Sequence, residues 1–259
     1  MKSAIITGAS KGLGRALSIE LCSLGYDVLL IARSADRLVS LSAELEQNYP
    51  VKAHTLVLDL AQSGAMEEVK IWCENNFFRP SVLVNNAGFA CWGYFGELSL
   101  PRQMEMLQLH IQGTISLTHH LLPILKSQPR AFVLNVCSTS AYQVVPTLTL
   151  YAASKAFVRS FSRGLRYELR KTNVSVTCLS PGPMSTYFLE EASMGPMETT
   201  AKKFEMPPGV VAKEGIKAMF NRRTEVIPGF TNYFTVAVSK IIPDAWLERI
   251  AANLYESKL

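Results

Sequence analysis

The chain has 259 residues, of which 48% are hydrophobic and 18% are charged, and its formal net charge is +5. This composition is typical of a globular domain with a well-filled core, and it excludes a disordered or fibrous protein. The basic residues are dispersed with no aromatic-rich module, which argues against nucleic-acid binding, and no apolar run reaches the roughly 18 residues of a membrane-spanning helix.

Short apolar runs alternate with longer amphipathic segments. The runs predicted as strands are Ala4–Thr7, Val28–Ala32, Ala53–Leu58, Val82–Val84, Ala131–Val136, Val174–Leu179 and Thr224–Ile227. Strands that are apolar on both faces and separated by helices form parallel sheets covered on both sides. We therefore predict a doubly wound, Rossmann-type α/β fold in a single domain, residues 1–259.

Two segments of this domain have a composition of their own. Residues 184–208 are rich in methionine and proline, and we regard them as a possible substrate flap. Residues 229–259 are predicted to be a C-terminal helical tail. Within the tail, Tyr233 to Pro243 is apolar enough for association with a membrane surface, although a packed terminal helix is the more ordinary interpretation.

The first strand ends in a glycine-rich turn. Three glycines follow Thr7 within seven residues, and a helix is predicted from Arg15 to Leu24. Glycines let the backbone approach a pyrophosphate closely, and the start of a helix attracts anions. The turn therefore predicts a dinucleotide site, with a plain strand-to-helix connection as the alternative. The candidate binding residues are Gly8, Ser10, Lys11, Gly12, Leu13 and Gly14.

The end of the second strand indicates which dinucleotide binds. Arg33 and Ser34 follow this strand, whereas Asp27 lies at its opposite end. A carboxylate at the carboxyl end would bind the ribose hydroxyls of NAD, and a cation there would bind the additional phosphate of NADP. Arg33, with Lys11 and Ser34, therefore favours NADP(H). A solvated surface cation is the alternative for Arg33.

The third and fourth strands end in further candidates. Asp59, with Leu60 beside it, is placed to accept a hydrogen bond from the adenine amino group, although a loop carboxylate is nearly as common there. The fourth strand leads into Asn85-Asn86-Ala87-Gly88, a turn of small residues that can lie flat along a cofactor. We count Asn86, Ala87 and Gly88 among the cofactor-binding residues, and we expect Asn86 to hydrogen-bond across the sheet and fix this loop.

Tyr151 and Lys155 form a candidate catalytic pair. They are four residues apart on a helix predicted from Tyr151 to Leu169, so they share one face. A cation about 4 Å from the phenol, at an effective dielectric of about 20, is worth around 4 kcal/mol, or roughly three pKa units. On its own such a pair is more often an aromatic ring packed beside a lysine. Ser138, at the end of the fifth strand, favours catalysis because its hydroxyl can donate to a substrate carbonyl.

Taken together, these motifs resemble the short-chain dehydrogenase/reductase superfamily from Lys2 to about Thr186. The shared features are TGxxxGxG at Thr7–Gly14, NNAG at Asn85–Gly88, YxxxK at Tyr151–Lys155 with a serine before it, and Pro181-Gly182 followed by Thr186. The resemblance implies that Ser138 orients the carbonyl, that Tyr151 is the acid or base, and that Lys155 lowers its pKa and binds the nicotinamide ribose. It places Pro181, Gly182 and Thr186 near the nicotinamide. It also implies a homodimer or homotetramer.

His110 departs from the family pattern. It stands where the family usually has an asparagine, three residues before a glycine, whose main-chain carbonyl helps to hold a water linked to the lysine. Histidine titrates near pH 6.5, so His110 is a candidate member of the catalytic proton relay. The alternative is a ring that is packed or hydrogen-bonded locally.

The loops after Gly88 and before Tyr151 are expected to wall an apolar pocket, although core or interface positions are an equal alternative. The residues concerned are Phe89, Trp92, Tyr94, Phe95, Tyr142, Val144, Val145 and Leu148. A closer resemblance to reductases related to long-chain ketoacyl and hydroxysteroid enzymes implies a lipophilic substrate. We predict NADPH-dependent reduction of a carbonyl to an alcohol. A dinucleotide-binding sensor or scaffold without turnover is the second hypothesis, with His110 as its motivating feature.

The remaining signals concern metals, thiols and location. The five cysteines form no CxxC pair, which predicts free and mostly buried thiols rather than disulfides or a zinc site. His119 and His120 have no partner at ligand spacing, so we predict no metal. A short apolar run and a glycine turn follow Lys2 directly, so we expect no secretory segment and a cytoplasmic protein.

Overall fold

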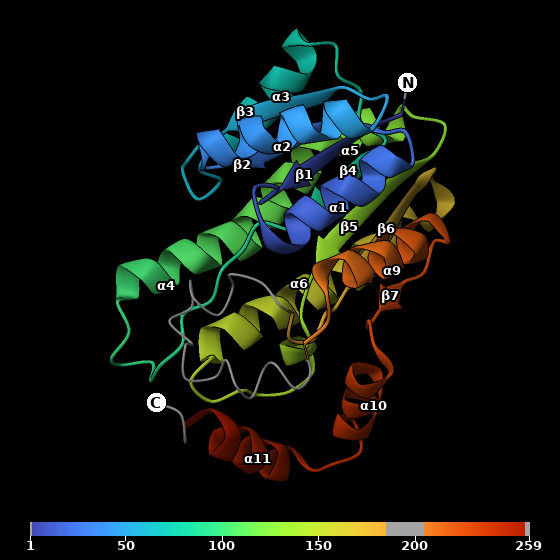
Figure 1. The fold of residues 1–259 in the computed structure, drawn as a ribbon. Coiled ribbons are helices and arrows are strands. Elements are labelled where there is room, and N and C mark those ends of the chain that lie inside the picture. Colours follow the sequence, from blue (N-terminus) through green and yellow to red (C-terminus); the bar gives the residue numbers. More distant parts are fainter. Residues whose placement is uncertain (1, 185–204, 257–259) are drawn as a thin grey trace.

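The computed structural model of the chain describes residues 2–184 and 205–256 (Figure 1). Its strands form one parallel sheet in the order β3-β2-β1-β4-β5-β6-β7. They are β1 (Ser3–Thr7), β2 (Asp27–Ala32), β3 (Ala53–Val57), β4 (Val82–Asn85), β5 (Ala131–Val136), β6 (Val174–Leu179) and β7 (Glu225–Val226). The doubly wound α/β fold is confirmed. The strand order reverses between β1 and β4, where such sheets bind ligands beyond their carboxyl ends.

Helices cover both faces of the sheet (Figure 1). One face carries α1 (Gly12–Ser23), α2 (Ala35–Asn48) and α9 (Pro208–Phe220), and the other carries α3 (Ala65–Asn75), α5 (Thr114–Lys126) and α6 (Thr149–Glu168). Side chains alternate between the faces along each strand. Ile6 therefore packs with Leu17 of α1, whereas the adjacent Ile5 packs with Leu117 of α5, and all of these side chains are almost fully buried. This explains why the predicted strands are apolar on both faces.

A π-helical segment interrupts one long helix. The chain is helical from α4 (Leu100–Leu107) through η1 (Gln108–Gly113) into α5, and η1 has π geometry. A π turn accommodates an extra residue, and such turns are frequent at functional sites. This turn contains His110, whose side chain is buried.

Two helices follow the sheet at its β7 edge. Gly229, with φ of +82°, turns the chain into α10 (Phe230–Ser239), and α11 (Asp244–Glu256) continues from it. Both lie at one end of the molecule, beyond α6 and α9 (Figure 1). Of the possible substrate flap, only Met184 and residues 205–208 are described, and Met184 forms an isolated bridge with Met206. None of the described helices is long and apolar enough to cross a membrane.

Candidate active site

A cavity of about 970 Å³ extends beyond the carboxyl ends of the strands, from the end of β2 to α11. It brings together almost all of the predicted site residues. Those that line it are Gly8, Ser10, Lys11, Gly12, Leu13, Gly14, Arg33, Ser34, Asp59, Leu60, Asn86, Ala87, Gly88, Ser138, Tyr151, Lys155, Pro181 and Gly182. His110 lies behind this lining, and Thr186 lies outside the described residues.

The glycine turn is shaped by close contacts that exclude side chains. Gly8 and Gly12 have φ of +64° and +55°, in the left-handed region that favours glycine. A Cβ on Gly14 would lie 2.1 Å from the carbonyl oxygen of Gly8, and one on Gly8 would lie 2.9 Å from the Cα of Ala87. Helix α1 begins at Gly12, earlier than the predicted Arg15, so its first turn lies on the cavity. This is the geometry of an anion site at a helix start.

Asn86 and Thr7 fix the neighbouring loop to this turn. Asn86 Nδ2 donates to the carbonyl oxygen of Thr7 at 2.9 Å, and Thr7 Oγ1 accepts from the N–H groups of Asn86 and Ala87 at 2.9 and 3.0 Å. The predicted hydrogen bond of Asn86 across the sheet is thereby confirmed. The two strand ends thus form one rigid wall of the cavity.

At the other end of the cavity, Arg33 is held by an ion pair. Its Nη1 lies 3.4 Å from Glu105 Oε1, and Glu105 Oε2 lies 2.6 Å from Arg102 Nη1. The Arg33 side chain is 54% exposed, so this pair is weak and can exchange partners. Arg37 of α2 also lines this end and was missed from the sequence, although it lies only four residues after Arg33. Asp59 lines the cavity nearby, with Oδ1 accepting from the N–H of Ala61 at 3.0 Å.

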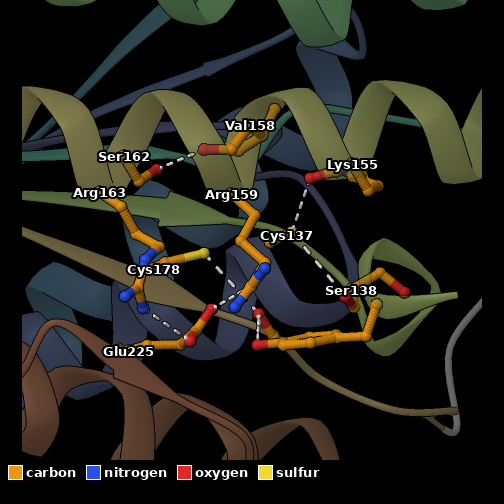
Figure 2. Close-up of polar contacts among 11 residues, drawn as sticks. Cys137, Ser138, Lys155, Val158, Arg159, Ser162, Arg163, Cys178 and Glu225 are labelled. Carbon is orange, nitrogen blue, oxygen red and sulfur yellow. Dashed lines mark hydrogen bonds and ion pairs between the residues drawn. The ribbon is translucent and has the colours of Figure 1, made fainter. Parts of the chain in front are cut away.

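Ser138, Tyr151 and Lys155 meet at the centre of the cavity. Ser138 follows β5, and its Oγ accepts from the N–H of Ser140 at 3.1 Å at the start of η2 (Thr139–Tyr142). The buried Tyr151 hydroxyl is hydrogen-bonded to the Ser138 side chain. Lys155 Nζ donates to the carbonyl oxygen of Val136 at 3.2 Å and lies 5.7 Å from the centre of the Tyr151 ring. Figure 2 shows the main-chain carbonyl oxygen of Lys155 on α6, which accepts from Cys137 Sγ at 3.0 Å just after β5.

Burial shifts the pKa values of Tyr151 and Lys155. It raises the pKa of Tyr151 above the usual value for a phenol, and the hydrogen bond from Ser138 only partly opposes it. Burial also lowers the pKa of Lys155, with the thiols of Cys137 and Cys178 acting in the opposite direction. The sequence predicts that Lys155 brings the pKa of Tyr151 towards neutrality, whereas in the structure desolvation of the phenol is the largest influence and raises that pKa. Tyr151 is therefore held as a neutral phenol, the form that donates a proton.

His110 uses both ring nitrogens within the protein. Its Nε2 accepts from the N–H of Phe89 at 3.3 Å, and its Nδ1 lies 2.8 Å from Ser154 Oγ, which donates to the carbonyl oxygen of Tyr151 at 2.7 Å. Since Ser154 donates elsewhere, His110 Nδ1 carries the proton and the ring is neutral. Burial, followed by the charge of Lys155, holds the pKa of His110 well below its usual value. The structure thus shows the locally bonded ring, the second of the two roles that the sequence allowed.

His110 also explains the glycine of NNAG. A Cβ on Gly88 would lie 2.5 Å from His110 Nε2. The imidazole therefore packs directly on the loop that borders the cavity, while its other nitrogen bonds to α6. His110 connects the NNAG loop to the helix that carries Tyr151.

Ion pairs hold helix α6 against β7 on the side away from the cavity. Glu225 accepts from Arg159 Nε at 2.8 Å and pairs with Arg163 Nη1 at 3.4 Å (Figure 2). Arg159 also stacks on Tyr142, with its guanidinium carbon 4.3 Å from the ring centre. Tyr142 donates to Ser180 Oγ at 3.2 Å. These contacts fix the position of the catalytic helix relative to the sheet.

The predicted apolar walls are only partly correct. Phe89, Val145 and Leu148 line the cavity. The other predicted walls do not: Trp92 packs in the adjoining core, Tyr94, Phe95 and Val144 are exposed, and Tyr142 is held by Ser180. A wall that the sequence did not predict comes from α10, α11 and the connection between them. It comprises Thr231, Asn232, Phe234, Thr235, Val236, Val238, Ser239, Ile242, Leu247, Ile250, Ala251 and Tyr255.

Helix α11 reaches the catalytic centre directly. Leu247, Ala251 and Tyr255 are spaced by four residues and line the cavity, and this helical spacing is visible in the sequence. The Tyr255 ring packs against the cluster that contains Phe89 and Tyr151. Burial raises the pKa of the Tyr255 hydroxyl. The cavity is therefore apolar on the side of α11 and polar on the side of the glycine turn.

Metal ligands and thiols can be examined in the described part of the chain. This part contains no group of side chains arranged to hold a metal ion. All five cysteines fall within it as free thiols, four of them buried.

Comparisons with known proteins agree with this geometry. A family model described as short chain dehydrogenase matches residues 2–195. An uncharacterized oxidoreductase of Staphylococcus saprophyticus is 30% identical over 84% of this chain and 91% of its own. The very-long-chain 3-oxoacyl-CoA reductase of Laccaria bicolor is 33% identical over 72% of this chain and 54% of its own. Among solved structures, the alcohol dehydrogenase from the archaeon Thermococcus sibiricus, complexed with 5-hydroxy-NADP, is similar with a TM-score of 0.78. That structure is 28% identical, and the match covers 88% of this chain and 95% of that one.

Proposed function

The chain belongs to the short-chain dehydrogenase family of oxidoreductases, and on that basis we propose that it is an NADP(H)-dependent carbonyl reductase with a lipophilic ketone or ketoacyl substrate. One observation carries the proposal. Ser138, Tyr151 and Lys155 meet where the glycine-walled part of the cavity joins its apolar part. A reaction between a dinucleotide and an apolar carbonyl compound would take place at this junction.

The residues present fit a nicotinamide dinucleotide. Added Cβ atoms on Gly8 and Gly14 would collide with Ala87 and with the Gly8 carbonyl oxygen, so the turn is closely packed without these side chains. A turn of this kind lets its backbone approach a pyrophosphate. Arg33, Arg37 and Lys11 line the adenosine end and suit the additional phosphate of NADP(H). The solved complex of the similar alcohol dehydrogenase with 5-hydroxy-NADP supports this choice.

Each polar side chain then has a role in the reaction. A bound nicotinamide cofactor would supply a hydride to the carbonyl carbon. Ser138 and Tyr151 donate hydrogen bonds to the carbonyl oxygen, and Tyr151, neutral in the buried site, transfers its proton to that oxygen. Lys155 stabilises the phenolate that remains and hydrogen-bonds the nicotinamide ribose. Oxidation of an alcohol follows the same steps in reverse.

The apolar half of the cavity supports a lipophilic substrate. Phe89, Leu148, Leu247 and Tyr255 surround the position that a substrate carbonyl would take beside Tyr151. Such walls favour an alkyl or ring system over a sugar, because a polar substrate would lose hydrogen bonds to water without gaining others. The relative from Laccaria bicolor, named as a very-long-chain 3-oxoacyl-CoA reductase, is consistent with this class. We further propose a cytoplasmic homodimer or homotetramer.

The test is a panel of ketones, from small water-soluble compounds to long-chain and steroid ketones, assayed with NADPH and with NADH. We expect oxidation of NADPH that rises with substrate lipophilicity. Ser138→Ala should reduce kcat by about 10²-fold or more with little change in NADPH binding. Nucleotide binding without turnover across the panel would favour the sensor or scaffold hypothesis instead.

A further inference from the structure

Helices α10 and α11 and the connection between them present a set of large apolar side chains to solvent. We name this set the apolar face; it comprises Phe230, Tyr233, Phe234, Ile241, Trp246 and Ile250. Phe230 and Ile241 are 83% and 82% exposed. Helix α10 contains no charged residue, and the rings of Phe230 and Phe234 stack with their centres 6.3 Å apart. Soluble monomers seldom expose such a group of neighbouring apolar side chains unless something binds there.

The apolar face continues into the cavity. Phe234 and Ile250 belong to both: each is 59% exposed, and each lines the cavity. Along the same helices, Val238 and Leu247 form the cavity wall next to them. The apolar surface and the apolar half of the active site are therefore one continuous surface, with Phe234 and Ile250 at the opening.

This continuity restricts what can cover the apolar face. A second copy of the chain or a rigid protein partner seated on Phe234 and Ile250 would close the opening between them. A lipid bilayer would cover the same side chains and still deliver an apolar molecule into the opening, because its own acyl phase dissolves that molecule. Trp246 and Tyr233 combine an apolar ring with a polar atom, which suits the membrane–water interface.

We propose that the apolar face binds the surface of a lipid bilayer and that a lipophilic carbonyl substrate passes from the bilayer through the opening to Tyr151. The proposal rests on the proposed function for the nature of the substrate. Helix α11 carries Asp244, Glu248, Arg249 and Glu256, and Lys240 follows α10, so these two cations and three anions leave a local net charge of −1. Apolar burial rather than attraction to anionic lipid therefore provides the binding.

The test is flotation of the full chain with vesicles of phosphatidylcholine alone or mixed with phosphatidylglycerol. The test variant combines Phe230→Ser, Ile241→Ser and Trp246→Ser, none of which lines the cavity. The matched control combines Val39→Ser, Phe77→Ser and Tyr167→Ser, which are 61%, 86% and 67% exposed elsewhere on the surface. Circular dichroism and kcat on a small water-soluble ketone confirm that both variants are folded.

We expect the wild type and the control variant to float with both vesicles to a similar extent, because the apolar face carries no excess of positive charge. The test variant should lose at least about tenfold in partitioning. A wild type that stays out of the lipid fraction would overturn the proposal. So would a test variant that floats like the wild type, or a wild-type dimer that the test variant converts to a monomer and that does not float. Flotation needs neither cofactor nor turnover, so absence of carbonyl reduction with intact flotation would contradict the proposed function alone.

Discussion

His110 connects two other parts of the chain through its two ring nitrogens. It accepts from Phe89, directly after the NNAG residues, bonds to Ser154 on α6, and packs on Gly88 of the same loop. Asparagine could reproduce one of these bonds but not the ring contact. We therefore regard His110 as a positioning residue that holds the loop against the helix carrying Tyr151.

The buried, neutral His110 makes the protein less stable in acid. Its pKa is lowered in the folded state, while in the unfolded chain it titrates near 6.5. Below that pH the unfolded state takes up a proton that the folded state does not, so the stability present above pH 6.5 is lost as the pH falls. One such group contributes at most about 1.4 kcal/mol per pH unit.

Urea unfolding at pH 7.5 and pH 5.5 measures this loss, and His110→Asn is the informative variant. We expect a smaller fall in the free energy of unfolding for the variant, because the three other histidines are common to both proteins. An equal fall in the free energy of unfolding for the wild type and the variant would show that His110 accepts a proton in the folded state. The pH profile of kcat should be the same in the variant, since neither ring nitrogen is available to a proton relay.

Arg33 offers a second test at the residue scale. We expect Arg33→Ala to raise the Kd of NADPH by about 10- to 100-fold, which is the usual loss for a charged hydrogen bond, and to leave the Kd of NADH nearly unchanged. Glu105→Gln is the matched control. It removes the ion pair of Arg33 but keeps the cation, so NADPH should bind as well as or better than in the wild type. Equal losses for both nucleotides on Arg33→Ala would refute NADP preference through Arg33.

At the scale of elements, the strands were predictable and the helical details were not. Each predicted strand lies within one residue of the observed one at either end, because strands buried on both faces read as unbroken apolar runs. Glycine is a poor helix former, so the sequence predicts that α1 starts at Arg15. In the structure Gly12 and Gly14 belong to its first turn. The π turn at His110 has no signal in apolar spacing, since it reflects long-range contacts of one side chain.

The site was predictable to the extent that it follows strand ends. Asn86 comes directly after β4 and Ser138 is the second residue after β5, so their convergence follows from the parallel sheet. Tyr255 and Arg37 were missed. The position of Tyr255 depends on how two terminal helices dock, which the pattern of a single helix does not encode, and Arg37 reaches the cavity only through the orientation of α2.

Helix α11 should therefore control the choice of substrate. We expect Tyr255→Ala to lower kcat/KM for a long-chain or steroid ketone by about tenfold, because an aromatic wall beside Tyr151 is lost. The Kd of NADPH should stay within about twofold, since Tyr255 is on the apolar side. Leu24→Ala, an exposed apolar residue after α1, is the control. An unchanged kcat/KM across the ketone panel would show that α11 does not touch the substrate.

At the scale of the whole molecule, cofactor binding should stabilise the folded state. The cavity is bordered by the glycine turn, by the Pro181-Gly182 loop and by α10, which are far apart in sequence. A ligand that binds only the folded state adds about 2.7 kcal/mol at 100 times its Kd. Thermal unfolding with saturating NADPH should thus give a higher Tm than the same concentration of NADH. Equal shifts would indicate that the adenosine end does not recognise the additional phosphate.

The central claim is that Tyr151 delivers the proton to a carbonyl beside a bound nicotinamide. Its most direct test is the NADPH-dependent reduction of the best ketone by Tyr151→Phe, with NADPH binding measured in parallel by fluorescence. The variant removes one hydroxyl and keeps the ring packing. We predict that kcat falls by about 10²- to 10⁴-fold while the Kd of NADPH changes little. A variant that retains wild-type kcat would contradict the account.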